Sequence, residues 1–219
     1  MVINGQVVDT IAAGTGALVP NYQTAEFTFI APANGEVTFG FQSLSSDSFG
    51  VIIDNLRIEA VELPVPEITN PSFEQPVVNT WALITGGSGA LPGWSITSEN
   101  AEIDRTPWPA AEGNQSMDLN GTKSSSIEQV VNGFASGGSY SLVVDFALHS
   151  FAKTGATAEV LINDEVIKVL SATTAAIAPN YQAVEIPFIA SGGAVKLGFK
   201  GLGQTSTGVV IDNIRLKSN

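Results

Sequence analysis

The chain of 219 residues is strongly acidic, with a formal net charge of −12 and a pI of about 4.3. Such a surface repels nucleic acid, and a content of 44% apolar against 14% charged residues is too apolar for a disordered chain. Without cysteine, the chain has neither disulfides nor thiol chemistry.

Short apolar or alternating stretches, separated by Gly, Pro, Asn and Ser, predict an all-β protein. In residues 1–60 the expected strands are Val2–Ile11, Thr24–Ala31, Glu36–Gln42 and Gly50–Ala60. Further along the chain, the expected strands are Ser72–Glu74, Gly93–Ile96, Gln115–Leu119, Ser125–Val131, Ser139–Ala147, Ala158–Ile162, Glu165–Leu170, Gln182–Ile189, Ala194–Lys200 and Gly208–Leu216. Many short strands within about 150 residues are typical of an antiparallel β-sandwich, most simply a jelly roll.

Two stretches of the chain repeat each other. Residues 2–31 and 161–190 share 14 identities in 30 aligned positions. After a shift of one residue, 37–58 and 195–216 share 11 identities in 22, and the motif GVIIDNLRIEA coincides with GVVIDNIRLK. Identity at this level over both blocks indicates an internal duplication.

The duplication covers only part of a domain, because the long stretch between the copies has no counterpart upstream. The sequence therefore predicts one complete jelly-roll domain over 66–219. Residues 1–60 are interpreted as the C-terminal half of another such domain, repeating 160–217. The Pro-containing VELPVPE, residues 61–67, is interpreted as a linker.

Half a sandwich would expose an apolar inner face and unpaired strand edges. Residues 1–60 are therefore expected to pack on something, and the sequence predicts contacts between copies of the chain through them. They could replace 160–217 against the first half (66–150), as an exchange of half domains that gives a dimer, a ring or a filament. Alternatively, both copies lie on one extended β-structure, or 1–60 is a truncated piece that pairs across a two-fold axis.

Four motifs occur in a fixed order: NPSFEQP, LPGWSIT, WPAAEGNQSMDLNG and GVVIDNIRL. Together they resemble the choice-of-anchor C domains of bacterial surfaces and the related plant cell-wall proteins. The resemblance covers about residues 66–217 in full and 1–60 in its C-terminal half. It implies a galactose-binding-like jelly roll that lies outside the cell or at its surface and, as in the plant relatives, associates with wall polysaccharide.

NPSFE near the start and IDN near the end are also similar to the layout of xylan- and cellulose-binding modules, in which the first and last strands hold a structural calcium. By that resemblance Glu74 and Asp212 would be calcium ligands, helped by backbone carbonyls and the Asn70 side chain. The alternative is that both carboxylates only accept hydrogen bonds from neighbouring backbone. Asp54 stands at the position of Asp212 in the first copy, without a partner like Glu74.

Sugar sites on such sandwiches combine an aromatic ring, which stacks on the sugar, with polar groups for the hydroxyls. Trp108, in a loop between two prolines, and Trp81, in a Gly-rich region, are candidates for the ring. Tyr181 is a third candidate, although it shares the stretch PNYQ with Tyr22 and could instead anchor a turn. Trp94 follows a turn and is expected in the core.

Catalytic signatures are weak, since no GxSxG, HExxH or phosphate-binding loop occurs. The single histidine, His149, follows an apolar strand, which favours a surface position or a hydrogen-bonded structural role. Asp104, Glu112 and Asp118 could form a glycosidase-like carboxylate pair, but their spacing does not require it.

The sequence therefore predicts a non-catalytic, extracellular module with structural calcium, whose partner is polysaccharide or a cell-wall glycan and which neither binds nucleic acid nor spans a membrane. The first residues, MVINGQVVDT, do not form a signal peptide, so an export signal is expected upstream. The alternative function is a structural subunit of an extracellular assembly, built by exchange of half domains. A polysaccharide-acting enzyme is a third possibility.

Overall fold

The computed structural model describes residues 1–12, 21–31, 35–44, 50–173 and 178–219, so parts of both repeats lie outside the described residues. The chain divides into two units, Met1–Val61 (unit 1) and Glu62–Asn219 (unit 2). Every regular element in the described part of the chain is a β-strand. Accordingly, none of the described residues form a helix that could cross a membrane.

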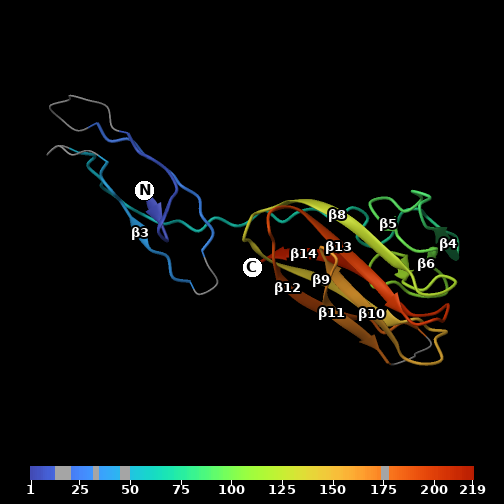
Figure 1. The fold of residues 1–219 in the computed structure, drawn as a ribbon. Coiled ribbons are helices and arrows are strands. Elements are labelled where there is room, and N and C mark those ends of the chain that lie inside the picture. Colours follow the sequence, from blue (N-terminus) through green and yellow to red (C-terminus); the bar gives the residue numbers. More distant parts are fainter. Residues whose placement is uncertain (13–20, 32–34, 45–49, 174–177) are drawn as a thin grey trace. The chain divides into compact units, whose positions relative to one another are not determined.

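Unit 2 is a sandwich of two antiparallel sheets, which confirms the predicted all-β jelly-roll class (Figure 1). One sheet has five strands, in the spatial order β11 (Glu165–Ala172), β10 (Ala156–Ile162), β13 (Gly193–Leu202), β8 (Ser126–Phe134) and β5 (Ser95–Ile96). The other has six, in the order β12 (Gln182–Ile189), β9 (Ser139–Leu148), β14 (Val209–Ser218), β7 (Ser116–Asp118), β6 (Asn100–Asp104) and β4 (Trp81–Thr85).

The core of unit 2 lies between these sheets and follows the two-residue period of the strands. On β6, Ala101 and Ile103 are fully buried in the core, so Glu102 and Asp104 project from the opposite face of the sheet. The Trp94 ring packs in the core between Phe73 and Phe199, with ring centroids 5.7 and 6.0 Å away, as the sequence predicts for this tryptophan.

Unit 1 contains a small sheet in the order β2 (Gln6–Val7), β1 (Val2–Ile3) and β3 (Phe39–Gly40). Its registers equal those of the aligned residues in unit 2. Val2 pairs with Val7 and Gly40, as Leu161 pairs with Val166 and Gly198. The two copies therefore share the local pairing of β10, β11 and β13.

One reciprocal pair of hydrogen bonds also recurs. Asn4 donates its backbone N–H to the Thr38 carbonyl and accepts the Thr38 N–H on its side chain. Asn163 makes the same two bonds with Lys196. Both asparagines have a positive φ, 49° and 51°, which asparagine tolerates better than most residues.

Several expected strands differ from the structure. Val2–Ile11 is not one strand, because the Asn4–Gly5 turn folds it into the β1–β2 hairpin. Thr24–Ala31 and Gly50–Ala60 are not strands, and Ser72–Glu74 is a turn followed by a loop.

Two strands of the six-stranded sheet, β4 and β6, were not expected. Strand β6 is apolar on one face only, whereas β4 carries apolar side chains on both faces, Trp81 and Leu83 on one and Ala82 and Ile84 on the other. The outer face of β6 is acidic, and β4 leads directly into a glycine-rich turn.

Candidate functional site

The face of the six-stranded sheet that points away from the core gathers acidic side chains. Across neighbouring strands, Trp81 is paired with Asp104, Asp104 with Ser116, and Glu102 with Asp118. Directly paired residues place their side chains on the same face, about 5 Å apart at Cβ. The strand register therefore brings one tryptophan and three carboxyl groups together.

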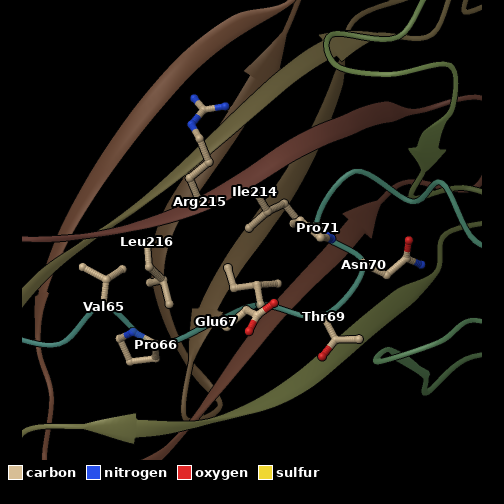
Figure 2. Close-up of a pocket in the computed structure, with 10 residues that line it drawn as sticks. Val65, Pro66, Glu67, Thr69, Asn70, Pro71, Ile214, Arg215 and Leu216 are labelled. Carbon is tan, nitrogen blue, oxygen red and sulfur yellow. The ribbon is translucent and has the colours of Figure 1, made fainter.

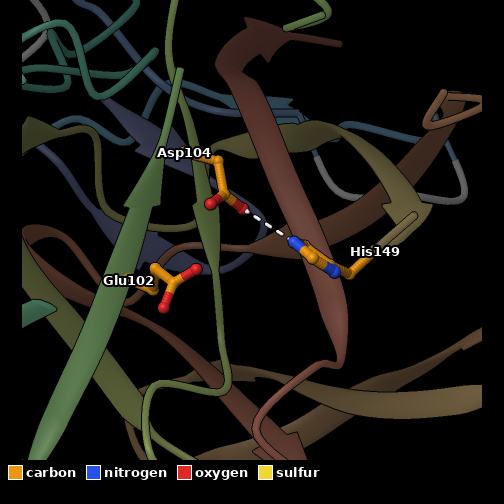
Figure 3. Close-up of side chains that lie close together, drawn as sticks. All are labelled: Glu102, Asp104 and His149. Atoms are coloured by element: carbon orange, nitrogen blue, oxygen red, sulfur yellow. Dashed lines mark ion pairs between the residues drawn. The ribbon is translucent and has the colours of Figure 1, made fainter. Parts of the chain in front are cut away.

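Asp104 and His149 form the buried centre of this face (Figure 3). Their side chains are 1% and 3% exposed, and His149 Nε2 lies 3.5 Å from Asp104 Oδ2. Glu102 is close by, with ligand atoms of all three side chains within 4.8 Å of one another. Asp104 hydrogen-bonds to the neighbouring side chain of Glu102, whereas His149 Nε2 has no hydrogen-bond partner among the described residues. A buried polar atom without a partner is uncommon.

Burial controls the charge of this cluster. Burial, followed by the charges of Glu102 and Asp118, raises the pKa of Asp104 to about 9. Burial also raises the pKa values of Glu102 and Asp118 and lowers the pKa of His149. At neutral pH, Asp104 is therefore an uncharged carboxylic acid beside an uncharged imidazole.

The tautomer of His149 bears on whether this cluster could hold a metal ion. The backbone N–H of Phe151 donates to His149 Nδ1 at 3.2 Å, so the proton of the neutral ring lies on Nε2, the atom that faces Asp104. A metal ligand needs a free lone pair on that nitrogen. The observed arrangement thus presents Nε2 to Asp104 as an N–H group and does not fit metal coordination by this nitrogen.

Aromatic rings surround the acidic centre. The Trp108 ring lies 5.4 Å from that of His149 and 5.3 Å from that of Phe151, which is 61% exposed. The hydroxyl of Tyr181 is buried beside the side chain of Ser116, to which it hydrogen-bonds. Its pKa is raised by burial and by the charges of Asp212, Asp104 and Asp118.

We refer to this region as the acid–aromatic face, which comprises Trp81, Glu102, Asp104, Trp108, Asp118, His149, Phe151 and Tyr181.

The structure brings the three predicted ring candidates to this one face. Trp81 lies on strand β4 and is 51% exposed, not in the expected loop. Trp108 contacts His149, and the charges of the cluster act on Tyr181. The predicted surface position of His149 is wrong, because its ring is buried. The alternative of a hydrogen-bonded role holds for Nδ1, which accepts the Phe151 N–H, but not for Nε2, which has no hydrogen-bond partner among the described residues.

Of the predicted carboxylates, Asp104 and Asp118 lie on this face, whereas the exposed Glu112 interacts with Asp212 through its backbone N–H. Sequence reasoning missed Glu102. Glu102 and Asp104 are two residues apart, which places both side chains on one face if NAEID is a strand. The sequence alone predicts no strand there.

Two of the predicted calcium ligands meet at the loop of residues 111–115. Glu74 Oε1 accepts the N–H groups of Asn114 and Gln115, each at 2.7 Å. From the other side, Asp212 Oδ2 accepts the N–H groups of Ala111 and Glu112, at 2.7 and 2.8 Å. The two carboxylates therefore clamp this loop from the first and last parts of unit 2.

The clamp already uses much of the hydrogen-bonding capacity of both carboxylates. Asp212 Oδ1 also accepts the N–H of Asn213, and burial raises the pKa of Asp212 to about 7. Asn70 is directed elsewhere, because its side-chain amide bonds both backbone groups of Gln75. Calcium binding by these residues stays a prediction.

A groove of about 400 Å³ lies elsewhere on unit 2, between residues 65–71 and Ile214–Leu216 of β14 (Figure 2). The charged head of its Arg215 is already paired, with Asp145 and with the carbonyl of Asn213. Its Asn70 amide is likewise engaged. Because this groove has no cluster of unpaired polar groups, the acid–aromatic face is the better candidate for a functional site.

No family model and no curated protein sequence matches the chain. Among solved structures, a cyclase from Fischerella sp. TAU in complex with 4-(1H-indol-3-yl)butan-2-one is similar, with 20% identity and a TM-score of 0.50, over 73% of this chain and 98% of the cyclase. A family 35 carbohydrate-binding module from Clostridium thermocellum shows 17% identity and a TM-score of 0.46, over 64% of this chain and all (100%) of the module. At such identities the similarity to the cyclase shows the fold alone.

The acid cluster predicts an unusual dependence of stability on pH. The pKa of Asp104 is raised from 3.8 to about 9 by folding, so its favourable contribution is complete below pH 3.8 and is lost as the pH rises towards 9. We expect Asp104→Asn, which cannot ionise, to raise the melting temperature at pH 9 by at least about 3 °C, and by less at pH 5.

Thermal unfolding of wild type and variant at pH 5, 7 and 9 measures this difference. Glu165→Gln, which alters an exposed acid on β11, is the control and should show no such trend. A difference between wild type and Asp104→Asn that does not change with pH would contradict the expectation.

Proposed function

We propose that unit 2 is a carbohydrate-binding module that takes a neutral polysaccharide at the acid–aromatic face. The observation that carries the proposal is the pairing of Trp81, whose ring is half exposed, with Asp104 at the edge of an acidic sheet face that also carries the partly exposed Glu102. A sugar ring that stacks on the tryptophan would present its hydroxyl groups to this acidic face.

The charge state of the face supports a neutral ligand. With Asp104 protonated and His149 uncharged at neutral pH, the centre offers both donors and acceptors, which suits hydroxyl groups. Trp108 and Phe151 add apolar surface beside it. The motif resemblance to cell-wall and surface proteins agrees with an extracellular polysaccharide as the partner.

Truncation of the rings tests the proposal. We expect Trp81→Ala and Trp108→Ala each to weaken binding to a responsive polysaccharide by about ten-fold or more, which corresponds to about 1.4 kcal/mol of lost contact. Calorimetric titration of wild type and variants with a panel of soluble plant and bacterial polysaccharides provides the measurement. Val169→Ala, which removes an exposed apolar side chain from the opposite sheet, is the matched control.

If the whole panel leaves the wild type without measurable binding, the proposal fails. It fails equally if a polysaccharide binds but neither tryptophan variant differs from Val169→Ala.

Structural calcium, held by Glu74 and Asp212 with Asn70, is a separate proposal, supported by the convergence of the two carboxylates on one loop. We expect millimolar calcium to raise the melting temperature of the wild type relative to EDTA, because a ligand of the folded state stabilises it. The effect should be absent in Glu74→Gln. Equal melting temperatures in calcium and EDTA would leave Glu74 and Asp212 as a loop clamp alone.

General-acid catalysis is a second candidate function, favoured by the raised pKa of Asp104 beside His149. A protonated, partly shielded carboxyl group can donate its proton to a bound substrate. Incubation of the wild type with labelled polysaccharides measures turnover. We expect Asp104→Asn to abolish any turnover while retaining binding, whereas the tryptophan variants should lose binding first. Turnover that persists in Asp104→Asn would remove this candidate.

A further inference from the structure

The sandwich of unit 2 shows what its C-terminal half requires. Strand β9 lies between β12 and β14 and pairs with both along most of its length. Strand β8 pairs with β13 in the other sheet. Both β8 and β9 belong to the first half and lie in different sheets, so the C-terminal half closes only around these two strands, one in each sheet.

Unit 1 repeats that C-terminal half. Its strands form only the pairings that join two strands of the C-terminal half to each other in unit 2. The β1–β2 and β1–β3 registers match those of β10–β11 and β10–β13. In contrast, residues 23–30 and 51–60, which align with β12 and β14, form no strand. The missing pairings are those that β9 supplies in unit 2.

The exposed fractions of aligned apolar side chains also differ between unit 1 and unit 2. Ile53 and Leu56 are 45% and 61% exposed in unit 1, whereas the aligned Ile211 and Ile214 are 0% and 2% exposed in unit 2. Apolar residues that are exposed in a group mark a surface that another chain segment covers. Unit 1 therefore exposes apolar side chains at positions that form the sandwich core in unit 2.

The 219 residues contain two C-terminal halves and one first half, and β9 of that first half is already paired on both sides. If unit 1 took β9 from another copy of these residues, it would displace that copy's β12 and β14. One C-terminal half would then be left without its partner strands.

We propose that unit 1 is an acceptor for a polypeptide segment outside this sequence that supplies two consecutive strands like β8 and β9. The β9-like strand of that segment inserts between residues 23–30 and 51–60 and pairs with both, as in strand addition to an exposed sheet edge. Its alternate side chains cover Ile53 and Leu56.

A chain extended by a second copy of residues 66–160, placed directly before Val2, tests the proposal. Val160 of the added copy then leads into Val2 as it leads into Leu161 in unit 2. Hydrogen–deuterium exchange is measured for residues 23–30 and 51–58 in the original and extended chains. We expect exchange there to slow by on the order of 100-fold or more in the extended chain.

Two substitutions in the extended chain distinguish insertion of a strand from non-specific contact of the added residues with unit 1. Ile53→Asp and Val7→Asp both alter side chains that are exposed in unit 1, but the residues aligned with them, Ile211 and Val166, are 0% and 45% exposed. Ile53→Asp should abolish the protection, and Val7→Asp should preserve it.

Three results would overturn the proposal. The extension could leave exchange unchanged, or the two aspartate variants could behave alike. Alternatively, the original chain could already protect residues 51–58 in a dimer whose formation depends on concentration, as measured by light scattering. In that case the occupant is a second copy of this chain.

Discussion

The structure of unit 2 depends on the pairing of both edges of strand β9. The backbone N–H and C=O groups of a strand require partners, and β9 finds them in β12 on one side and in β14 on the other. On its inner face, Tyr140, Leu142 and Val144 are completely buried. One strand of the first half thus holds together two strands of the second half that do not contact each other within their sheet.

The same strand positions the candidate site. β9 ends at Leu148, and the next residue, His149, donates its backbone N–H to the Gly208 carbonyl at 3.0 Å. This bond fixes the chain at the end of the sheet, where the imidazole reaches Asp104. The closure of the sandwich and the assembly of the acid–aromatic face therefore have a common structural origin.

Placing several carboxyl groups on one largely buried face is unfavourable unless they bind protons or a ligand. Here burial and mutual repulsion raise the pKa of Asp104 far enough to keep it neutral at pH 7. Asp118 is stabilised differently, because its two oxygens accept the N–H groups of Asn120 and Gly208. Asp118 is therefore held by backbone donors, whereas Asp104 hydrogen-bonds to the side chain of Glu102.

The sequence alone determined the strand-rich class, the position of Trp94 in the core and the repetition of the C-terminal half. These features depend on local alternation and on similarity between two stretches of one chain. Residue type and loop position also pointed to Trp81, Trp108 and Tyr181, although not to their convergence. Strand β6 escaped detection because its outer face is acidic, and β4 because it is short and leads directly into a glycine-rich turn.

Only the tertiary structure decided which expected strands form and which polar groups meet. Residues 51–60 share the VxIDNxR pattern with β14, yet they form no strand, because strand formation depends on a partner strand that the neighbouring sequence does not supply. The cluster of Glu102, Asp104 and His149 likewise depends on the register of β6 and on the end of β9. Neither the burial of a side chain nor the loss of its hydrogen-bond partners can be deduced from its neighbours in the sequence, since both result from chain segments packed against it.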